Sequence, residues 1–200
     1  MLQIQNLKTH ARASLPTQYG NFKILAFSSD NQLLDHVALY RGNLQNAQNL
    51  PTRIHSECLT GDVFHSLRCD CRQQLESALR DFAGRPDALL LYMRQEGRGI
   101  GIANKIAAYR LQEQGMDTVD ANIHLGFDDD LRSYDIAAAI ISHLDIISLD
   151  LYTNNPNKIS GLTRLGIKVT HRHPIIIEPN DHNMRYLNTK RDRCGHMLNF

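Results

Sequence analysis

One segment restricts the fold of this chain more than any other: Ala88–Met93 is an almost uninterrupted apolar run of strand length. Such a run is typical of a strand buried on both faces. It follows Arg72–Ala83, where apolar residues recur at helical spacing until Gly84 and Pro86 end the pattern. A second helix is expected from about 102 to 114. Helices that alternate with buried strands predict an α/β sandwich.

The rest of the chain extends this pattern. Phe22–Phe27 and His36–Tyr40 are extended runs separated by a polar region, and this hairpin-like opening favours a mixed sheet over a parallel one. The helix from about 102 places Ile102, Ile106 and Tyr109 on one face. Further strands are expected at 52–57, 147–152, 167–170 and 174–177, and further helices at 133–144, 156–165 and from 181 onward. We therefore expect a single-domain, layered α/β fold with a mixed β-sheet over residues 1–200.

Composition excludes several classes of protein. The chain has 200 residues, of which 42% are hydrophobic and 22% charged, and this balance argues against disorder. No apolar run approaches the roughly 20 residues that a membrane helix needs, and Met1–Gln5 lacks the pattern of a secretion signal. Four cysteines are too few for a disulfide scaffold, so we expect a cytoplasmic protein with reduced thiols.

Charge is unevenly distributed along the chain. Residues 111–150 contain nine acidic residues and one basic residue, Arg132, although the whole chain has a formal net charge of +1. A cationic remainder beside an acidic block suits a polyanionic ligand that carries a divalent metal. The sequence has no domain-wide basic excess and no interleaved aromatic stripe, which argues against a nucleic-acid partner.

Three cysteines form the sharpest chemical motif, Cys58, Cys69 and Cys71 in the pattern Cys-x10-Cys-x-Cys. Three thiolates can hold one zinc ion and leave a fourth position for a water, whose pKa then falls to about 7. Two alternatives stay open: buried thiols without a metal, and a structural zinc site with a fourth protein ligand. The candidates for that fourth ligand are His55, His65 and Cys194.

Two turns are candidate phosphate sites. The first is Arg94–Gly101, where glycines and two arginines lie between the buried strand and a helix start. It lacks the third glycine of a dinucleotide-binding fingerprint, so a plain tight turn is the alternative. The second is Tyr152–Lys158, in which Asn155 is a good cap for a helix that begins at Pro156. A bare helix start is the alternative there.

An acidic loop, Asp128-Asp129-Asp130-Leu131-Arg132, is the fourth candidate. Consecutive carboxylates can bind magnesium that accompanies phosphates, or raise the pKa of one aspartate enough for proton transfer. Taken alone, such a loop is more typical of a helix cap or a solvated surface.

Taken together, these segments resemble the GTP cyclohydrolase II family, whose members open the guanine ring of GTP at the entry to riboflavin synthesis. Several motifs in family order are far more specific than any one of them, and they cover residues 14–198, nearly the whole chain. The matching stretches are Arg53–Asp62, Ser66–Cys71, Arg94–Gly101, Asn104–Ile106 with Ala108 and Tyr109, Gly115–Asn122, Leu125–Phe127 and Thr153–Pro156.

The resemblance implies a site residue by residue. It makes Cys58, Cys69 and Cys71 the ligands of one zinc ion per chain, and it places a magnesium ion on the triphosphate. The implied substrate contacts are Arg53, Ile54, His55, Ser56, Glu57, Gln74, Glu96, Gly97, Arg98, Thr118, Thr153 and Lys158.

Three residues receive catalytic roles from the resemblance: Asp130 as proton acceptor, Arg132 as nucleophile toward the α-phosphate, and Tyr109 in ring opening. A register shift by one residue would put Asp129 in place of Asp130, but the spacing to Arg132 and Tyr134 favours Asp130. An arginine has a pKa above about 12, so a neutral guanidine is scarce at neutral pH. We therefore expect Arg132 to stabilise charge on the α-phosphate, oriented by Asp130, with water as the nucleophile.

The implied reaction is a series of hydrolyses of GTP. Water attacks carbon 8, the imidazole ring opens, formate is released and pyrophosphate is lost. The product would be 2,5-diamino-6-(5-phosphoribosylamino)pyrimidin-4-one, and Glu57 or Glu96 could accept the N–H groups of the guanine edge. The resemblance also implies a homodimer with no nucleic-acid or membrane partner. At this length we expect a single activity, without the dihydroxybutanone phosphate domain of some relatives.

One rival enzyme class shares the metal chemistry. A zinc-dependent nucleobase deaminase would need His-x-Glu together with Pro-Cys-x-x-Cys, and the sequence lacks this combination. A zinc module that binds nucleic acid would need a closed four-ligand site and a basic face, and neither is evident.

Overall fold

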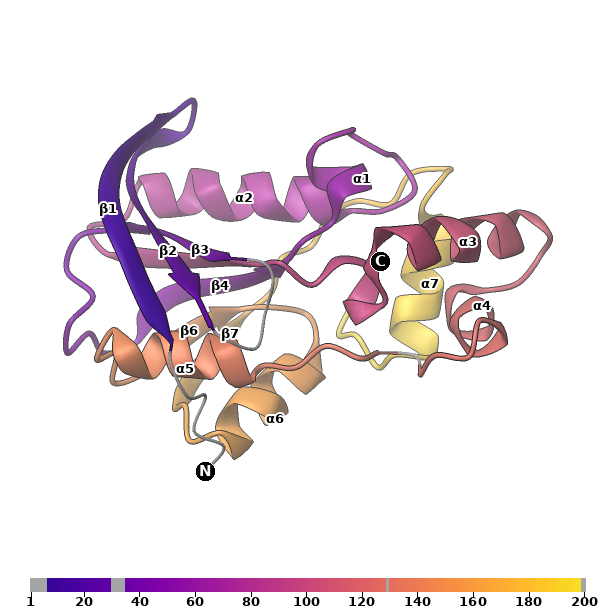
Figure 1. Ribbon diagram of the computed structural model, residues 1–200. Coiled ribbons are helices and arrows are strands. Elements are labelled where there is room, and N and C mark those ends of the chain that lie inside the picture. Colours follow the sequence, from indigo (N-terminus) through magenta and orange to yellow (C-terminus); the bar gives the residue numbers. More distant parts are fainter. Residues whose placement is uncertain (1–6, 30–34, 129, 199–200) are drawn as a thin grey trace. The chain divides into compact units, whose positions relative to one another are not determined.

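The computed structural model describes residues 7–29, 35–128 and 130–198 (Figure 1). These residues form two compact units, each assembled from several stretches of chain. The first unit draws on the described residues of Met1–His55, Glu76–Arg94 and Ser133–Ile175, and the second on those of Ser56–Leu75, Gln95–Arg132 and Ile176–Phe200. No helix within the described ranges combines the length and the apolar content that crossing a membrane requires.

The first unit is built around a mixed sheet. Its described residues form seven strands in the order β1-β2-β3-β5-β4-β6-β7. The pairs β1–β2, β2–β3 and β3–β5 are antiparallel, whereas β4–β6 and β6–β7 are parallel. The expected mixed α/β sheet is therefore confirmed. The strands are β1 (Lys8–Thr17), β2 (Gly20–Ser28), β3 (His36–Arg41), β4 (Leu50–Ser56), β5 (Ala88–Met93), β6 (Leu149–Tyr152) and β7 (Val169–His173).

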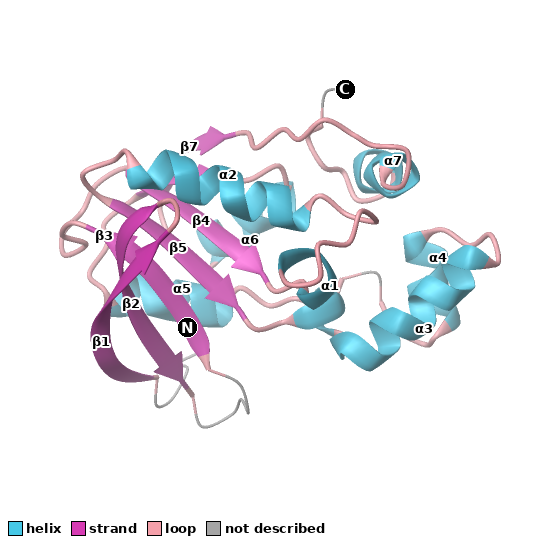
Figure 2. Ribbon diagram, turned by 90° about the horizontal axis from the view of Figure 1, so that it is seen from above, coloured by secondary structure: helices cyan, strands magenta, loops and turns pink. Residues whose placement is uncertain are grey.

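Helices cover both faces of this sheet (Figures 1 and 2). Helix α2 (Cys71–Ala83), most of which belongs to the first unit, lies on one face. Helices α5 (Asp135–His143) and α6 (Pro156–Arg164) lie on the other. The core between the layers includes Leu89 and Leu91 of β5, both fully buried. Burial of each such side chain contributes roughly 1.5–3 kcal/mol, so the apolar run of β5 anchors the sheet.

The second unit is helical. Its elements are α1 (Leu59–Asp62), a 3-10 turn η1 (Glu96–Gly99), α3 (Gly101–Glu113), α4 (Thr118–His124) and α7 (Met184–Asp192). Helix α3 packs against α4, and α4 contacts α7. Helix α4 begins where the Asp117 side chain accepts hydrogen bonds from the backbone N–H groups of Val119 and Asp120.

Two strand predictions differ from the structure. Strand β1 was not expected, because most of its residues are exposed and its sequence therefore lacks the alternation that marks a half-buried strand. In the C-terminal third, the extended run expected at 167–170 overlaps β7 (Val169–His173), whereas Pro174–Ile177 forms no strand.

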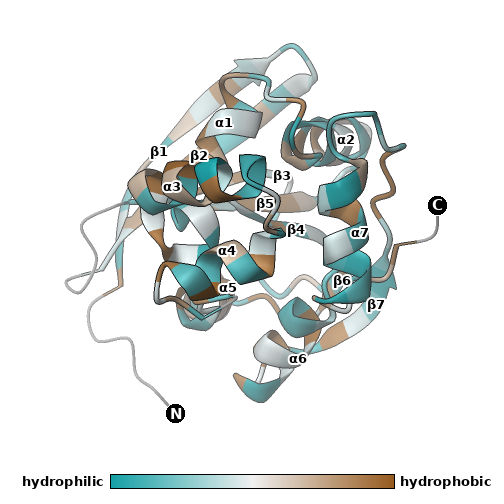
Figure 3. Ribbon diagram, turned by 90° about the vertical axis from the view of Figure 1, so that its right-hand side faces the viewer, coloured by the Kyte–Doolittle hydropathy of each residue, from teal (hydrophilic) through white to brown (hydrophobic). Residues whose placement is uncertain are grey.

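Helix α3 leaves part of its apolar face exposed. Ile102 and Ile106 share a face, but they are 38% and 50% exposed, and the buried residue of the helix is Ala108. Helix α3 thus carries apolar residues at its surface (Figure 3). The periodicity identified the helix correctly, and the structure adds that Ala108 is its buried residue.

Candidate metal centre and active site

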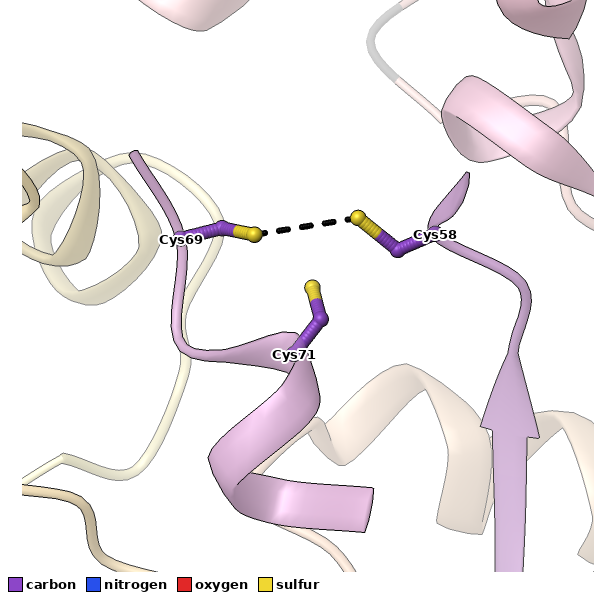
Figure 4. A group of neighbouring side chains, drawn as sticks. All are labelled: Cys58, Cys69 and Cys71. Carbon is purple, nitrogen blue, oxygen red and sulfur yellow. Dashed lines mark hydrogen bonds between the residues drawn. The ribbon is translucent and has the colours of Figure 1, made fainter. Parts of the chain in front are cut away.

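Three thiols converge in the second unit, where Cys58 precedes α1, Cys69 precedes α2 and Cys71 is the first residue of α2 (Figure 4). The Sγ atoms of Cys58 and Cys69 are 3.7 Å apart, and the three Sγ atoms lie within 4.8 Å of one another. A tetrahedral zinc ion with Zn–S bonds of about 2.3 Å requires sulfur atoms about 3.8 Å apart. The spacing of the thiols therefore fits three ligands of one zinc ion.

Gly61 of α1 permits this convergence. A Cβ atom at this position would lie 2.8 Å from Cys69 Sγ and 3.2 Å from Cys58 Sγ. Any side chain larger than that of glycine would therefore push the thiols apart. The sequence analysis gave Gly61 no role, although it lies inside the stretch Arg53–Asp62 that carried the resemblance.

Both the backbone and the side chain of Cys58 contact neighbouring residues. Its backbone N–H donates to Asp62 Oδ2 over 3.0 Å. Its Sγ lies 3.1 Å from the ammonium group of Lys105, which also donates to Glu96 Oε1 over 2.8 Å. The second carboxylate oxygen of Glu96 accepts the backbone N–H of Leu59 over 2.5 Å. Lys105 received no role from the sequence, where it appeared only inside the Asn104–Ile106 match.

The three thiols differ in pKa. Hydrogen bonds from Cys69 and Cys71, together with the charge of Lys105, hold the pKa of Cys58 well below its usual range. The hydrogen bond to Cys58 raises the pKa of Cys69 to about 11, and that to Cys58 also raises the pKa of Cys71. A metal ion that binds this trio must displace the remaining thiol protons, so its affinity rises with pH.

None of the candidate fourth ligands belongs to the group of side chains that could hold the metal ion. Among the described residues of the second unit, no further His, Cys, Asp or Glu belongs to the group. His65 is exposed, and Cys194 accepts a hydrogen bond from Arg98 Nη1 over 3.5 Å. In the first unit, the ring of His55 stacks on Tyr92 with centroids 5.4 Å apart. Three protein ligands are typical of catalytic rather than structural zinc sites.

Tyr109 lies beside the trio. Its hydroxyl is 3.1 Å from Thr60 Oγ1, and that oxygen is 3.7 Å from Cys58 Sγ. The guanidinium group of Arg68 lies over the ring, 4.6 Å from its centroid. Burial raises the pKa of Tyr109 above its usual value, although Lys105 opposes this shift. The phenol therefore stays protonated at neutral pH and can donate a hydrogen bond.

Asp130 and Arg132 form a two-pronged ion pair. Arg132 donates from Nε to Asp130 Oδ1 over 2.7 Å and from Nη2 to Oδ2 over 2.5 Å. Burial acts to raise the pKa of Asp130, but the hydrogen bonds and charge of Arg132 outweigh it and lower the pKa. The carboxylate of Asp130 is therefore ionised, and both of its oxygen atoms accept hydrogen bonds from Arg132. Asp129, the alternative proton acceptor, lies outside the described residues.

The glycine-rich turn is in an unusual backbone conformation. Gly97, Arg98 and Gly99 have φ angles of 63°, 60° and 94°, a region that a residue with a side chain adopts only at a cost. The backbone oxygen of Arg98 accepts the N–H of Leu131 over 3.0 Å. A Cβ atom on Gly99 would lie 3.1 Å from the Leu131 side chain. This turn and the acidic loop are therefore packed against each other.

The other expected substrate residues of the second unit have the following positions. Gln74 donates to Asp70 Oδ2 over 2.5 Å, on the turn between Cys69 and Cys71. Ser56 Oγ accepts a hydrogen bond from Gln95 over 3.0 Å, and Glu57 is half-buried between Ser56 and Cys58. Thr118 is the first residue of α4.

The remaining expected residues belong to the first unit. Arg53 donates from Nη1 to the backbone oxygen of Tyr152 over 2.9 Å, and Lys158 donates to the backbone oxygen of Ile54 over 2.6 Å. Thr153 Oγ1 accepts the backbone N–H of Asn155 next to the start of α6. Strands β4 and β6 are parallel neighbours, so their carboxyl ends lie at the same end of the sheet. Two buried cations and one hydroxyl therefore lie near that end of the two strands.

The comparisons with known proteins agree with one another. A family model described as GTP cyclohydrolase II matches residues 8–174. The chain is 53% identical over 184 residues to the riboflavin biosynthesis protein RibBA of Endomicrobium trichonymphae, covering 92% of this chain and 46% of that protein. It is 48% identical over 192 residues to GTP cyclohydrolase-2 of Picrophilus torridus, covering 96% and 100%. It is also 48% identical over 188 residues to RibBA of Bacillus subtilis, covering 94% and 47%. The chain thus spans about half the length of these RibBA relatives.

Proposed function

Because the chain belongs to the GTP cyclohydrolase II family, we propose that it is an enzyme that opens the imidazole ring of GTP by hydrolysis. It releases formate and pyrophosphate and yields 2,5-diamino-6-(5-phosphoribosylamino)pyrimidin-4-one, the first step of riboflavin synthesis. The observation that carries this proposal is the trio of thiols, whose Sγ atoms lie within 4.8 Å of one another in a chain of this family.

Cys58, Cys69 and Cys71 hold one zinc ion per chain in this proposal. Zinc, when bound, supplies a Lewis acid that activates water toward an electron-poor carbon such as carbon 8 of the guanine. Tyr109, protonated and oriented by Thr60, donates a hydrogen bond during ring opening.

The phosphates are handled by other residues. The carboxylate of Asp130 fixes the guanidinium group of Arg132 in a two-pronged pair, and Arg132 stabilises charge on the α-phosphate. While this pair is intact, Asp130 is a weak proton acceptor, because its pKa is lowered. Arg53 and Lys158 of the first unit offer buried cations to a polyanion, and magnesium accompanies the triphosphate.

Either Glu57 or Glu96 reads the guanine edge in this proposal. Both carboxylate oxygens of Glu96 already accept hydrogen bonds, Oε1 from Lys105 and the Gly97 N–H, and Oε2 from the Leu59 N–H. Glu96 therefore also supports the site, and its backbone turn is a further proposed substrate contact. The other proposed substrate contacts are Ile54, His55, Ser56, Gln74, Gly97, Arg98, Thr118 and Thr153.

We also propose a homodimer that acts in the cytoplasm without a nucleic-acid or membrane partner. Family membership supports the dimer. The free thiols of the site support a reducing compartment, because oxidation would destroy the ligand set.

The test is product formation by the purified chain. With GTP and magnesium, formate and pyrophosphate should appear, zinc should be present at one ion per chain, and a zinc chelator should stop formate release. A chain that holds zinc through four protein ligands, as seen by X-ray absorption, or that releases neither product, would contradict the proposal.

A further inference from the structure

Lys105 of α3 is a buried cation in contact with a proposed zinc ligand. Its Nζ atom lies 3.1 Å from Cys58 Sγ and 2.8 Å from Glu96 Oε1. The side chains of Lys105 and Glu96 are 13% and 10% exposed. Withdrawing an ion pair from water is costly unless its geometry is good and further hydrogen bonds satisfy its donors, and the ammonium group of Lys105 is within hydrogen-bond distance of both partners.

The ion pair closes a ring of contacts around Cys58. Glu96 accepts from Lys105 through Oε1 and from the backbone N–H of Leu59 through Oε2. Leu59 directly follows Cys58, and the N–H of Cys58 itself donates to Asp62. The Lys105–Glu96 pair thereby contacts both the sulfur of Cys58 and the backbone of the residue that follows it.

The charge of a three-thiolate centre gives the ammonium group a second effect. Three thiolates and one divalent zinc ion sum to a negative charge, and strong donation from sulfur weakens the metal as a Lewis acid. A cation that donates a hydrogen bond to one sulfur withdraws part of that electron density. Lys105 is placed to do this at Cys58.

We propose that Lys105 is a positioning residue of the metal centre: its ammonium group holds the Cys58 sulfur in place and compensates the charge of the three thiolates, while Glu96 fixes the ammonium group. This inference rests on the proposed function and deepens it, because it gives the Lys105–Glu96 pair a role in metal binding.

The experiment compares three variants of the full zinc-loaded chain. Lys105→Met removes the cation, Lys105→Arg keeps it, and Arg110→Met removes an exposed cation from the same helix as the control. Zinc affinity is measured by competition with a chromogenic chelator. After replacement of zinc by cobalt, the energy of the sulfur-to-cobalt charge-transfer band reports the electron density on sulfur.

We expect Lys105→Met to bind zinc about 10–100-fold more weakly, and its charge-transfer band to move to longer wavelength because the uncompensated sulfur donates more readily. Lys105→Arg should retain the original band, and Arg110→Met should match the parent chain in both measurements. A Lys105→Met variant with unchanged zinc affinity and an unchanged band would overturn the inference.

Two further controls separate the possible failures. If Lys105→Met does not fold, as judged by circular dichroism, Lys105→Arg is compared with Lys105→Gln, because both donate a hydrogen bond but differ in charge. Equal band energies in these two would also refute the inference. A parent chain without zinc or formate release would refute the proposed function, whereas an active parent chain with an unaltered Lys105→Met variant would refute this inference alone.

Discussion

At the scale of single residues, the ion pair between Asp130 and Arg132 bears most directly on the mechanism. The spacing of these residues in the sequence predicted that they pair, and the structure contains that pair with two side-chain hydrogen bonds. A guanidinium group that is ionised and already held by a carboxylate is better suited to stabilise phosphate charge than to attack phosphorus.

Arg132→Ala should therefore reduce pyrophosphate release, by about 10²-fold if Arg132 supplies one charged donor to the transition state. Arg132→Lys should recover little of this loss, because lysine keeps the charge but cannot form the two-pronged pair. Steady-state assay of pyrophosphate measures both variants. Unchanged release in Arg132→Ala would remove this residue from the mechanism, and a guanylyl adduct trapped on Arg132 would restore it as the nucleophile.

Cys69→Ser separates the two halves of the proposed reaction. Loss of one sulfur ligand should abolish formate release, since the Lewis acid acts on the guanine carbon. Some pyrophosphate release should persist, because the Asp130–Arg132 pair does not depend on the thiols. The two products are measured in the same reaction mixture. Equal loss of both would argue against two separable sets of residues.

Elements differ in how well the sequence reveals them. Strand β5 was predicted with its observed bounds, because a strand buried on both faces must be apolar throughout. Strand β1 was missed, since exposure on both faces removes that constraint. The cysteines were found because their chemistry limits their spacing, whereas the support of Cys58 by Lys105 joins residues 47 positions apart and leaves no local pattern.

The cap of α4 can be tested with a matched pair of substitutions. Asp117→Ala should lower the free energy of unfolding by about 1 kcal/mol, because two backbone N–H groups lose their acceptor. Asp117→Asn should cost less, since asparagine is also a good cap. Thermal and urea unfolding measure both, and equal losses in the two variants would show that the ion pair with Arg193 dominates.

This cap also predicts a pH dependence. Burial would raise the pKa of Asp117, but hydrogen bonds from the backbone N–H of Asp120 and from Arg193 lower it. The stabilisation is therefore fully present above the unfolded pKa of about 3.9, and it is lost as pH falls through the lower folded value. The stability difference between the parent chain and Asp117→Asn should shrink toward about pH 2. A difference that is constant with pH would contradict this assignment.

Helix α7 is tied to the cysteine turn by a buried ion pair. Lys190 donates to Asp70 Oδ1 over 2.8 Å, and these residues are 8% and 2% exposed. Lys190→Met leaves a buried carboxylate without its cation, so it should lower the free energy of unfolding by about 3–5 kcal/mol. Combining it with Asp70→Leu should recover part of the loss. Chemical denaturation measures both, with Arg191→Ala, an exposed change on the same helix, as the control.

At the scale of the whole molecule, the two units explain the limits of the sequence analysis. The chain passes between the units at several points, one of them after His55, inside a single matching motif. Local periodicity predicts helices and strands, but it does not record which distant segments assemble together. The matching motifs identified the site residues as a set, and only the structure assigns them to one unit or the other.

Metal removal should affect the two units differently. The sheet of the first unit has a large apolar core of its own, whereas the thiols of the second unit are placed for a metal that binds only the folded state. Ligand binding of this kind stabilises the fold by about 2.7 kcal/mol when free zinc exceeds its dissociation constant 100-fold. After chelation, hydrogen exchange should therefore accelerate at Leu59–Asp62 and at the start of α2, while the amides of β5 remain protected.

Mass spectrometry of the exchanged peptides measures this, and the Arg110→Met chain serves as a control for a change without metal loss. Equal acceleration in β5 and α1 would mean that the metal stabilises the chain as one cooperative unit.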